Sequence, residues 1–165
     1  MKVAVVRGAN DVRVEDAPIP KIGRKEILVK MMACGVCGTD IKKMRGEFIT
    51  PAVLGHEAAG EIFDVGEEVA NLKTGERVLV HHHVPCYVCH YCRHGSYTMC
   101  EEFQRSNIDP GGFAEYFRVP ETNVDRGAVL RVPDSVTFEE AALVEPTACC
   151  IRSIMRCDIQ IGDDV

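Results

Sequence analysis

Short apolar runs separated by turn residues characterise most of the chain. The runs are rich in valine and isoleucine, partly alternate with polar residues, and end at glycine, proline or aspartate. Runs of this kind at close spacing predict the β-strands of a barrel or sandwich. The expected strands cover residues 2–7, 11–16, 26–33, 57–66, 75–84 and 111–120. The pattern therefore predicts a mainly β fold with a few helices.

Two segments carry helical signals instead. Residues 37–46 fit one short helix that ends at Gly46. Nearer the C-terminus, Thr137 and Glu140 form a capping-box pattern ahead of an apolar run. Pro146 is expected to break that helix and to open the next one, because proline is tolerated at the first helical position.

Composition limits the classes of protein to consider. The 165 residues suffice for one domain, and a formal net charge of -6 gives no reason to expect nucleic acid or an anionic membrane as a partner. No apolar run approaches the roughly 18–20 residues that span a bilayer. The N-terminus resembles a first strand and not an export signal. We therefore expect a cytoplasmic protein whose partners are small molecules, with no nucleic-acid or membrane partner.

Nine cysteines are many for a chain of this length. An odd number in a reducing compartment favours metal binding over disulfides. Four of them have the spacing C-x2-C-x2-C-x7-C, at Cys86, Cys89, Cys92 and Cys100. Four thiolates complete a tetrahedral shell around Zn²⁺ and leave no place for substrate, so such a site is structural. Its binding free energy would stabilise the surrounding loop, which has few apolar residues to bury.

Two other interpretations of these cysteines are weaker. Bacterial iron–sulfur proteins have a three-residue last gap followed by proline, whereas this gap is seven residues and no proline follows Cys100. Four ordinary buried cysteines would not require the repeated two-residue spacing.

The nearby histidines are weaker candidates than the four cysteines as metal ligands. His81–His83 are expected on a strand, where side chains alternate between faces, so they would line a surface or pocket. His90 and His94 are expected to be solvated loop residues.

A second set of candidate ligands is dispersed along the chain. Cys34 and Cys37 form a C-x-x-C, which by itself indicates either a redox pair or half of a zinc site. His56 and Glu57 follow in "GHEAAGEI". Together with the four-cysteine loop, "GGFAEYFRVP" and "EEAALVEPTACC", these motifs resemble the zinc-containing alcohol and polyol dehydrogenases of the medium-chain dehydrogenase/reductase superfamily. The resemblance covers essentially the whole chain.

The resemblance implies a fold and a set of site residues. Residues 1–165 would form the GroES-like β-barrel domain, the zinc catalytic domain of that superfamily, with its structural-zinc loop. Two Zn²⁺ ions per chain are implied. The catalytic zinc would be held by Cys37, His56, Glu57 and Glu145. The hydroxyl of Thr39 would contact the substrate oxygen, and Asp40 would orient the site from behind the ligands.

The implied reaction transfers hydride from a zinc-bound alkoxide to a nicotinamide, with Thr39 accepting the alcohol proton. One position departs from the family pattern. Many members have a histidine three residues after the Ser/Thr, and here that residue is Lys42. Lysine does not relay protons near neutral pH unless burial lowers its pKa. Proton release is therefore expected through water or through one of His81–His83.

The chain contains no G-x-G-x-x-G turn for NAD(P). The resemblance places the start of the missing Rossmann domain near Val165, so NAD(P) would bind only through that domain and this chain alone would be inactive as a dehydrogenase. Apolar surface left exposed would favour a homo-oligomer. Substrates would be alcohols, polyols, sugars or amino alcohols. Two alternatives stay open: a stand-alone zinc-binding module, and a hydrolase or hydratase that uses zinc-bound water.

Overall fold

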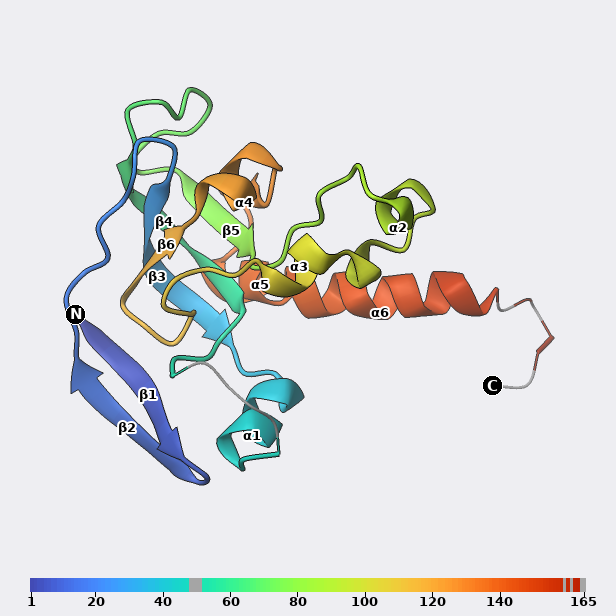
Figure 1. Cartoon of the computed structure of the whole chain (residues 1–165), viewed down its shortest axis with the longest axis horizontal. Helices are drawn as coiled ribbons and strands as arrows, with labels where there is room; N and C mark the ends of the chain where they lie inside the picture. Colours follow the sequence, from blue (N-terminus) through green and yellow to red (C-terminus); the bar gives the residue numbers. More distant parts are fainter. Residues whose placement is uncertain (48–51, 159, 161, 164–165) are drawn as a thin grey trace.

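The computed structural model describes residues 1–47, 52–158, 160, 162 and 163 (Figure 1). The domain boundary expected near Val165 lies outside the described residues. Seven strands occur in the order β1 (Lys2–Gly8), β2 (Asp11–Asp16), β3 (Ile27–Gly35), β4 (Glu57–Val65), β5 (Arg77–His81), β6 (Tyr116–Val119) and β7 (Val129–Arg131). The helices are α1 (Gly38–Met44), α2 (His90–Arg93), η1 (Tyr97–Met99), α3 (Glu101–Arg105), α4 (Glu121–Asp125), α5 (Phe138–Ala142) and α6 (Val144–Cys157).

The strands form two antiparallel sheets. Five of them have the order β6-β3-β4-β5-β7, and β1 pairs with β2 in a separate ladder. Isolated bridges from Val3 to Ala114 and from Val5 to Val53 hold the ladder against the rest of the molecule. The predicted mainly β fold is confirmed, although strand pairing among the described residues does not close into a barrel. β7 was not predicted, because a three-residue strand shows no measurable alternation.

The main core lies on the inner face of the five-stranded sheet. Ile27, Val29, Ile62, Val78 and Phe117 are completely buried there. They recur at every second residue of their strands, which is why the valine- and isoleucine-rich runs predicted strands. Each such side chain contributes about 1.5–3 kcal/mol when fully buried. This sheet therefore supplies a rigid base for the loops at its ends.

The predicted helix starts agree with the structure. α1 begins just after Cys37 and is followed by Gly46 at φ 81°, a conformation that favours glycine. At α5 the Thr137 hydroxyl accepts a hydrogen bond from the Glu140 amide at 3.2 Å, and the Glu140 carboxylate accepts one from the Thr137 amide at 2.8 Å. The predicted capping box is therefore present.

The break between the last two helices differs slightly from the prediction. It falls at Leu143 and not at Pro146, which lies within the first turn of α6. The first four amides of a helix have no intrahelical acceptor, so a proline in this turn forfeits no hydrogen bond. α6 extends away from the sheet (Figure 1), and none of its residues, all of which are described, is buried. Among the described helices, none has the length and apolar character that crossing a membrane requires.

Candidate metal centres

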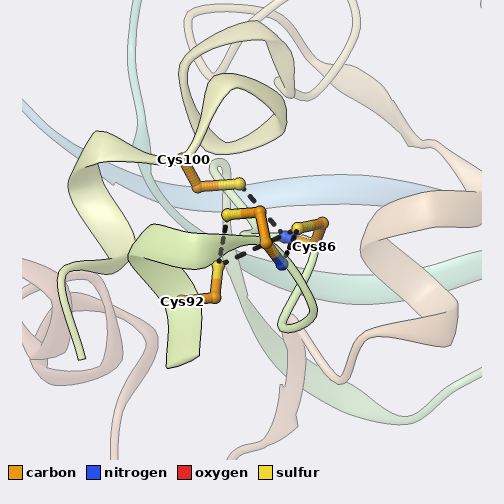
Figure 2. A group of neighbouring side chains, drawn as sticks. Cys86, Cys92 and Cys100 are labelled. Carbon is orange, nitrogen blue, oxygen red and sulfur yellow. Dashed lines mark hydrogen bonds between the residues drawn. The ribbon is translucent and has the colours of Figure 1, made fainter. Parts of the chain in front are cut away.

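The four cysteines of the C-x2-C-x2-C-x7-C motif converge in one loop. One sulfur from each of Cys86, Cys89, Cys92 and Cys100 lies within 4.8 Å of the others. The Sγ atoms of Cys89 and Cys92 are 3.5 Å apart, and those of Cys86 and Cys92 are 3.9 Å apart. Figure 2 shows Cys86, Cys92 and Cys100 directing their sulfur atoms toward one another. Ligands about 2.3 Å from a tetrahedral zinc lie about 3.8 Å from each other, so the spacing suits that ion.

Local backbone geometry produces this convergence. Tyr87 adopts φ 61° directly after Cys86, and the amide of Cys89 then donates to the Cys86 sulfur at 3.3 Å. A second turn follows α2, where Gly95 has φ 72°. The chain then returns through η1, and the Cys86 amide donates to the Cys100 sulfur at 3.3 Å. Amide donors of this kind stabilise thiolate sulfur, the form that binds metal.

The thiols of this loop respond differently to their surroundings. The amide of Cys86 lowers the pKa of Cys100 to about 6, against the effect of burial. Burial raises the pKa of Cys92 to about 12, and the neighbouring Cys89 sulfur raises it further. Packing four thiolates together without a cation is therefore unfavourable. All nine cysteines lie in described residues and are free, so no disulfide relieves the crowding.

A second cluster brings together residues from separate parts of the chain. Cys37 caps α1, His56 ends the loop before β4, and Glu57 is the first residue of β4. One ligand atom from each of these side chains lies within 4.8 Å of the other two. The donors are one sulfur, one imidazole nitrogen and one carboxylate oxygen. Three mixed donors leave a tetrahedral position open, as catalytic zinc sites do.

Asp40 links these elements from a position with no solvent exposure. Its carboxylate accepts a hydrogen bond from the Cys37 amide at 3.1 Å and another from the Gly55 amide at 3.3 Å. Its Oδ1 also lies 3.4 Å from Nδ1 of His56. With Nδ1 against Asp40, Nε2 is the ring nitrogen left available to a metal. A carboxylate behind a ligand histidine is a common way to fix the ring orientation and tautomer.

The electrostatics of the mixed cluster follow from these contacts. Asp40 raises the pKa of His56 to about 9, against the effect of burial. Burial opposes ionisation of Cys37, but the Thr39 amide and His56 together bring its pKa below the ordinary value. Burial raises the pKa of Glu57, with His56 opposing and Glu145 adding to the shift. A dication bound between them would favour the anionic forms of Cys37 and Glu57, and it would have to displace the proton that Asp40 stabilises on His56.

Cys34, the other cysteine of the C-x-x-C, points elsewhere. Burial raises its pKa to about 12. A Cβ built on Gly112 would lie 2.6 Å from its sulfur, and one built on Gly55 would lie 3.0 Å from it. The thiol thus fills a space between two glycines. It contributes no ligand atom to the cluster of Cys37, His56 and Glu57.

Two predicted site residues lie near the cluster without belonging to it. Glu145, in the first turn of α6, is close enough to Glu57 to raise the pKa of that carboxyl. Its Oε1 accepts a contact from the Cys149 thiol at 3.4 Å. Thr39 is exposed at the start of α1, and its amide lies 3.4 Å from the Cys37 sulfur. The structure therefore gathers three of the four predicted ligands of this site into one group.

The predicted placement of the histidine triplet was wrong in one respect. Only His81 belongs to β5, because the pairing of β5 with β4 ends where His81 meets Glu57. His82 lies beside His56, with ring centroids 4.9 Å apart. Burial lowers the pKa of His82 to about 2, so its ring is neutral. His90 and His94 are exposed as expected, although His90 begins α2 and is not in a loop.

His82 and His83 line a pocket of about 350 Å³ beside His56, which confirms the expectation of a pocket-lining role. The same pocket is bordered by Lys43 and Arg105, which the sequence did not indicate as site residues. One signal was available for Lys43. It follows Thr39 by four residues on α1, and residues with that spacing share a helix face.

Comparison with known proteins agrees with this geometry. Residues 23–134 match the family described as "Alcohol dehydrogenase GroES-like domain". The sorbitol dehydrogenase of Bacillus subtilis (strain 168) is 36% identical, over 100% of this chain and 48% of the relative. The L-threonine 3-dehydrogenase of Legionella pneumophila (strain Corby) is 35% identical, over 92% of this chain and 45% of the relative. The chain thus spans about half the length of the curated relatives it matches.

Solved structures include a similar fold. A protein from Sinorhizobium meliloti 1021, described as a zinc-binding dehydrogenase and solved bound to NADP, superposes with a TM-score of 0.82 at 31% identity. The superposition covers 98% of this chain and 46% of that chain. The described fold therefore matches about half of that solved chain.

Proposed function

Because the chain belongs to the alcohol dehydrogenase GroES-like domain family, we propose that it is the zinc-binding catalytic part of an NAD(P)-dependent alcohol or polyol dehydrogenase. The observation that carries the proposal is the cluster of Cys37, His56 and Glu57. These residues lie far apart in the sequence, yet they offer sulfur, nitrogen and oxygen donors to one point. Mixed donors with an open position are typical of catalytic zinc.

The donor sets fit two different roles for zinc. The four-cysteine loop offers four sulfurs at distances suited to a closed tetrahedral shell, so it would hold a structural ion. The Cys37 cluster offers fewer protein ligands and borders a pocket through His56. It would hold the catalytic ion. Two zinc ions per chain follow from this division.

Each residue of the catalytic cluster would have a separate task. Zinc bound there supplies Lewis-acid polarisation of the substrate oxygen. Cys37, His56 and Glu57 would hold the ion, and Asp40 would orient His56. Glu145 would add a carboxylate from the first turn of α6, in keeping with its closeness to Glu57. To bind the ion, Oε1 of Glu145 would give up its contact with the Cys149 thiol.

Proton release is assigned to Thr39 and solvent. The Thr39 hydroxyl would accept the alcohol proton and pass it outward. Thr39 is exposed, so water reaches it directly. Lys42 is exposed on α1 and lies outside the lining of the pocket beside His56. His81 and His83 each direct Nδ1 to a backbone carbonyl, which leaves them poorly placed for a relay. Water is therefore favoured over His81 and His83.

Substrate and cofactor extend the proposal beyond this chain. The names of the two curated relatives favour a polyol or an amino alcohol as the substrate class. Since the chain contains no G-x-G-x-x-G, NAD(P) would be bound by a Rossmann domain outside these residues, and the chain alone would be inactive as a dehydrogenase. A cytoplasmic homo-oligomer is the form in which we propose that it works.

Metal analysis of substituted proteins tests the proposal. We expect two zinc ions per chain, falling to one in Cys37→Ser and in His56→Ala because each removes a ligand of the catalytic ion. Cys100→Ala should lose the other ion. Cys157→Ser, an exposed cysteine at the end of α6, is the control and should keep both. Fewer than one zinc per folded chain would contradict the proposal.

Activity measurements on Cys37→Ser and Cys89→Ser separate the dehydrogenase from the two alternative functions. A zinc-water hydrolase or hydratase would cleave an ester or hydrate CO2 without NAD(P), losing this activity in Cys37→Ser and keeping it in folded Cys89→Ser. A stand-alone zinc module would bind both ions and support no NAD(P)H turnover when joined to an NAD(P)-binding domain. Turnover of sorbitol or threonine in that joined protein is the outcome expected here.

A further inference from the structure

The pocket beside His56 has a chemical character of its own. Its volume is about 350 Å³, which lies within the range of small-molecule sites. His56, which lines it, also belongs to the candidate catalytic cluster. Its polar and charged lining residues are Asp40, Lys43, His56, His82, His83, Gln104, Arg105, Ser106 and Asn107.

Two helices each contribute a basic side chain to the lining of this pocket. Lys43 comes from α1, and Arg105 is the last residue of α3. Lysine and arginine are the strongly basic residue types. The chain as a whole has a formal net charge of -6, so a pocket bordered by two cations is a local exception. A local excess of one sign raises the concentration of ligands of the opposite sign.

Acidic groups near the pocket do not cancel this charge. Asp40 is the acidic residue in the lining, and it is fully buried and already accepts from the Cys37 and Gly55 amides. Arg105 pairs with Glu101, but both side chains are exposed, at 76% and 71%. Exposed pairs of this kind contribute little, so Arg105 can exchange its partner for a ligand. Among the described residues, Lys43 takes part in no salt bridge.

The remaining lining suits a hydroxylated ligand. Gln104, Ser106 and Asn107 offer amide and hydroxyl groups along one wall, and the imidazoles of His82 and His83 face the same space. Ser106 Oγ already bonds to the backbone of Val84 and Phe103, and Gln104 Nε2 donates to the Thr98 carbonyl. The remaining polar groups of the lining can bind hydroxyls of a ligand. The lining therefore combines polyol-binding groups with a cationic rim.

We propose that the substrate of this site is a polyhydroxy alcohol carrying an anionic group, with Lys43 and Arg105 binding the anion while the reacting hydroxyl lies beside His56. The inference rests on the proposed function and specifies its substrate class. A phosphate monoester and a carboxylate share the chemistry that the two cations recognise. Arginine offers either of them a planar pair of donors, and lysine adds a point charge.

Binding to the zinc-loaded protein tests this proposal without requiring turnover. Calorimetric titration would compare sorbitol 6-phosphate, gluconate and sorbitol. We expect sorbitol 6-phosphate or gluconate to bind about tenfold more tightly than sorbitol, since a charge-assisted hydrogen bond contributes about that factor. Preference for sorbitol 6-phosphate identifies phosphate as the anion, and preference for gluconate identifies carboxylate. The advantage should shrink at high salt, as exposed charges are screened.

Matched variants assign the effect to the two cations. Lys43→Met and Arg105→Gln should each weaken binding of the anionic polyol about threefold to tenfold and leave sorbitol binding unchanged. Lys42→Met is the control, because it removes the same charge from the exposed neighbour outside the pocket and should change neither affinity. Equal affinity for charged and uncharged polyols would overturn the inference, as would an anion preference that survives both variants. Zinc content measured in the same samples separates these outcomes from a failure of the proposed function, which would appear as loss of the catalytic ion.

Discussion

At the scale of single residues, Asp40 has the most connected position in the candidate active site. It is a charged side chain with no solvent exposure, a costly placement unless its oxygens are paired. Its oxygens receive the amides of Cys37 and Gly55 and lie against His56. One carboxylate therefore fixes two of the three candidate ligands relative to each other. The sequence suggested an orienting role for Asp40, and the structure identifies the groups that it contacts.

Replacing this carboxylate by its amide tests that role. Asp40→Asn keeps the shape and removes the charge behind His56, so we expect zinc affinity at the mixed site to fall about 10–100-fold. Competition with a fluorescent zinc chelator measures the affinity. The four-cysteine site should be unaffected and serves as an internal control. Asp64→Asn, an exposed aspartate on β4, should alter neither site. Unchanged affinity in Asp40→Asn would remove Asp40 from the site.

Gly55 shows a different constraint, since it precedes His56 and determines where that residue lies. Its φ is 87°, and a Cβ added there would lie 2.6 Å from Cδ1 of Phe113 and 2.8 Å from the Phe113 amide nitrogen. Gly75 has nearly the same φ, 85°, but nothing within 4 Å of an added Cβ. Both glycines therefore have a positive φ that disfavours other residues, but only Gly55 lacks room for a side chain.

The pair allows the two costs to be separated. Gly75→Ala should lower the free energy of unfolding by about 1–2 kcal/mol through backbone strain alone. Gly55→Ala should cost about 1–3 kcal/mol more, because the methyl group must displace Phe113 or the backbone. Urea denaturation of the two variants measures the difference. Equal losses would show that the Phe113 contact adjusts without cost.

At the scale of elements, local sequence signals located the helix starts well. Cys37 begins α1 and Thr137 begins α5, each with a reciprocal side-chain and backbone cap. Such caps depend only on residues three apart, so they can be recognised without knowing the fold. The end of an element depends on its partner. β5 stops at His81 because its pairing with Glu57 stops there, although the sequence predicted a strand over residues 75–84.

The cap at α5 provides a prediction for an isolated local interaction. Thr137→Ala removes the hydroxyl that accepts from the Glu140 amide, so the free energy of unfolding should fall by about 1 kcal/mol. Thr137→Ser retains the hydroxyl and should recover most of the loss. Thr98→Ala, at an exposed threonine outside any capping box, should change stability little. Thermal denaturation of the three variants provides the measurement, and a Ser variant as unstable as the Ala variant would contradict the assignment.

At the scale of the whole molecule, stability has two different sources. The core clusters lie in and around the sheets, where valine, isoleucine and phenylalanine are buried. Residues 86–105, all described, bury no apolar side chains except Cys92 and Cys100. That loop has no hydrophobic core of its own, so its order would depend on the proposed structural zinc.

Metal removal should therefore disorder one region selectively. After treatment with a chelator, we expect backbone amides of residues 86–105 to lose protection from hydrogen exchange, while those of β3 and β4 keep theirs. Mass spectrometry of peptides from the two regions measures the difference. Added zinc should restore protection in wild-type protein and fail to do so in Cys100→Ala. Equal loss of protection in β3 and β4 would show that the sheet also depends on metal.

The sequence by itself determined the mainly β fold, the starts of α1 and α5, and the convergence of the four cysteines. These features depend on side-chain alternation, capping residues and short spacings, all of which act between near neighbours. Only the tertiary structure decided which groups Asp40 contacts, where Cys34 lies, and that Lys43 and Arg105 border one pocket. Contacts between residues this far apart follow from how the sheet and loops pack, and local sequence patterns carry no record of that packing.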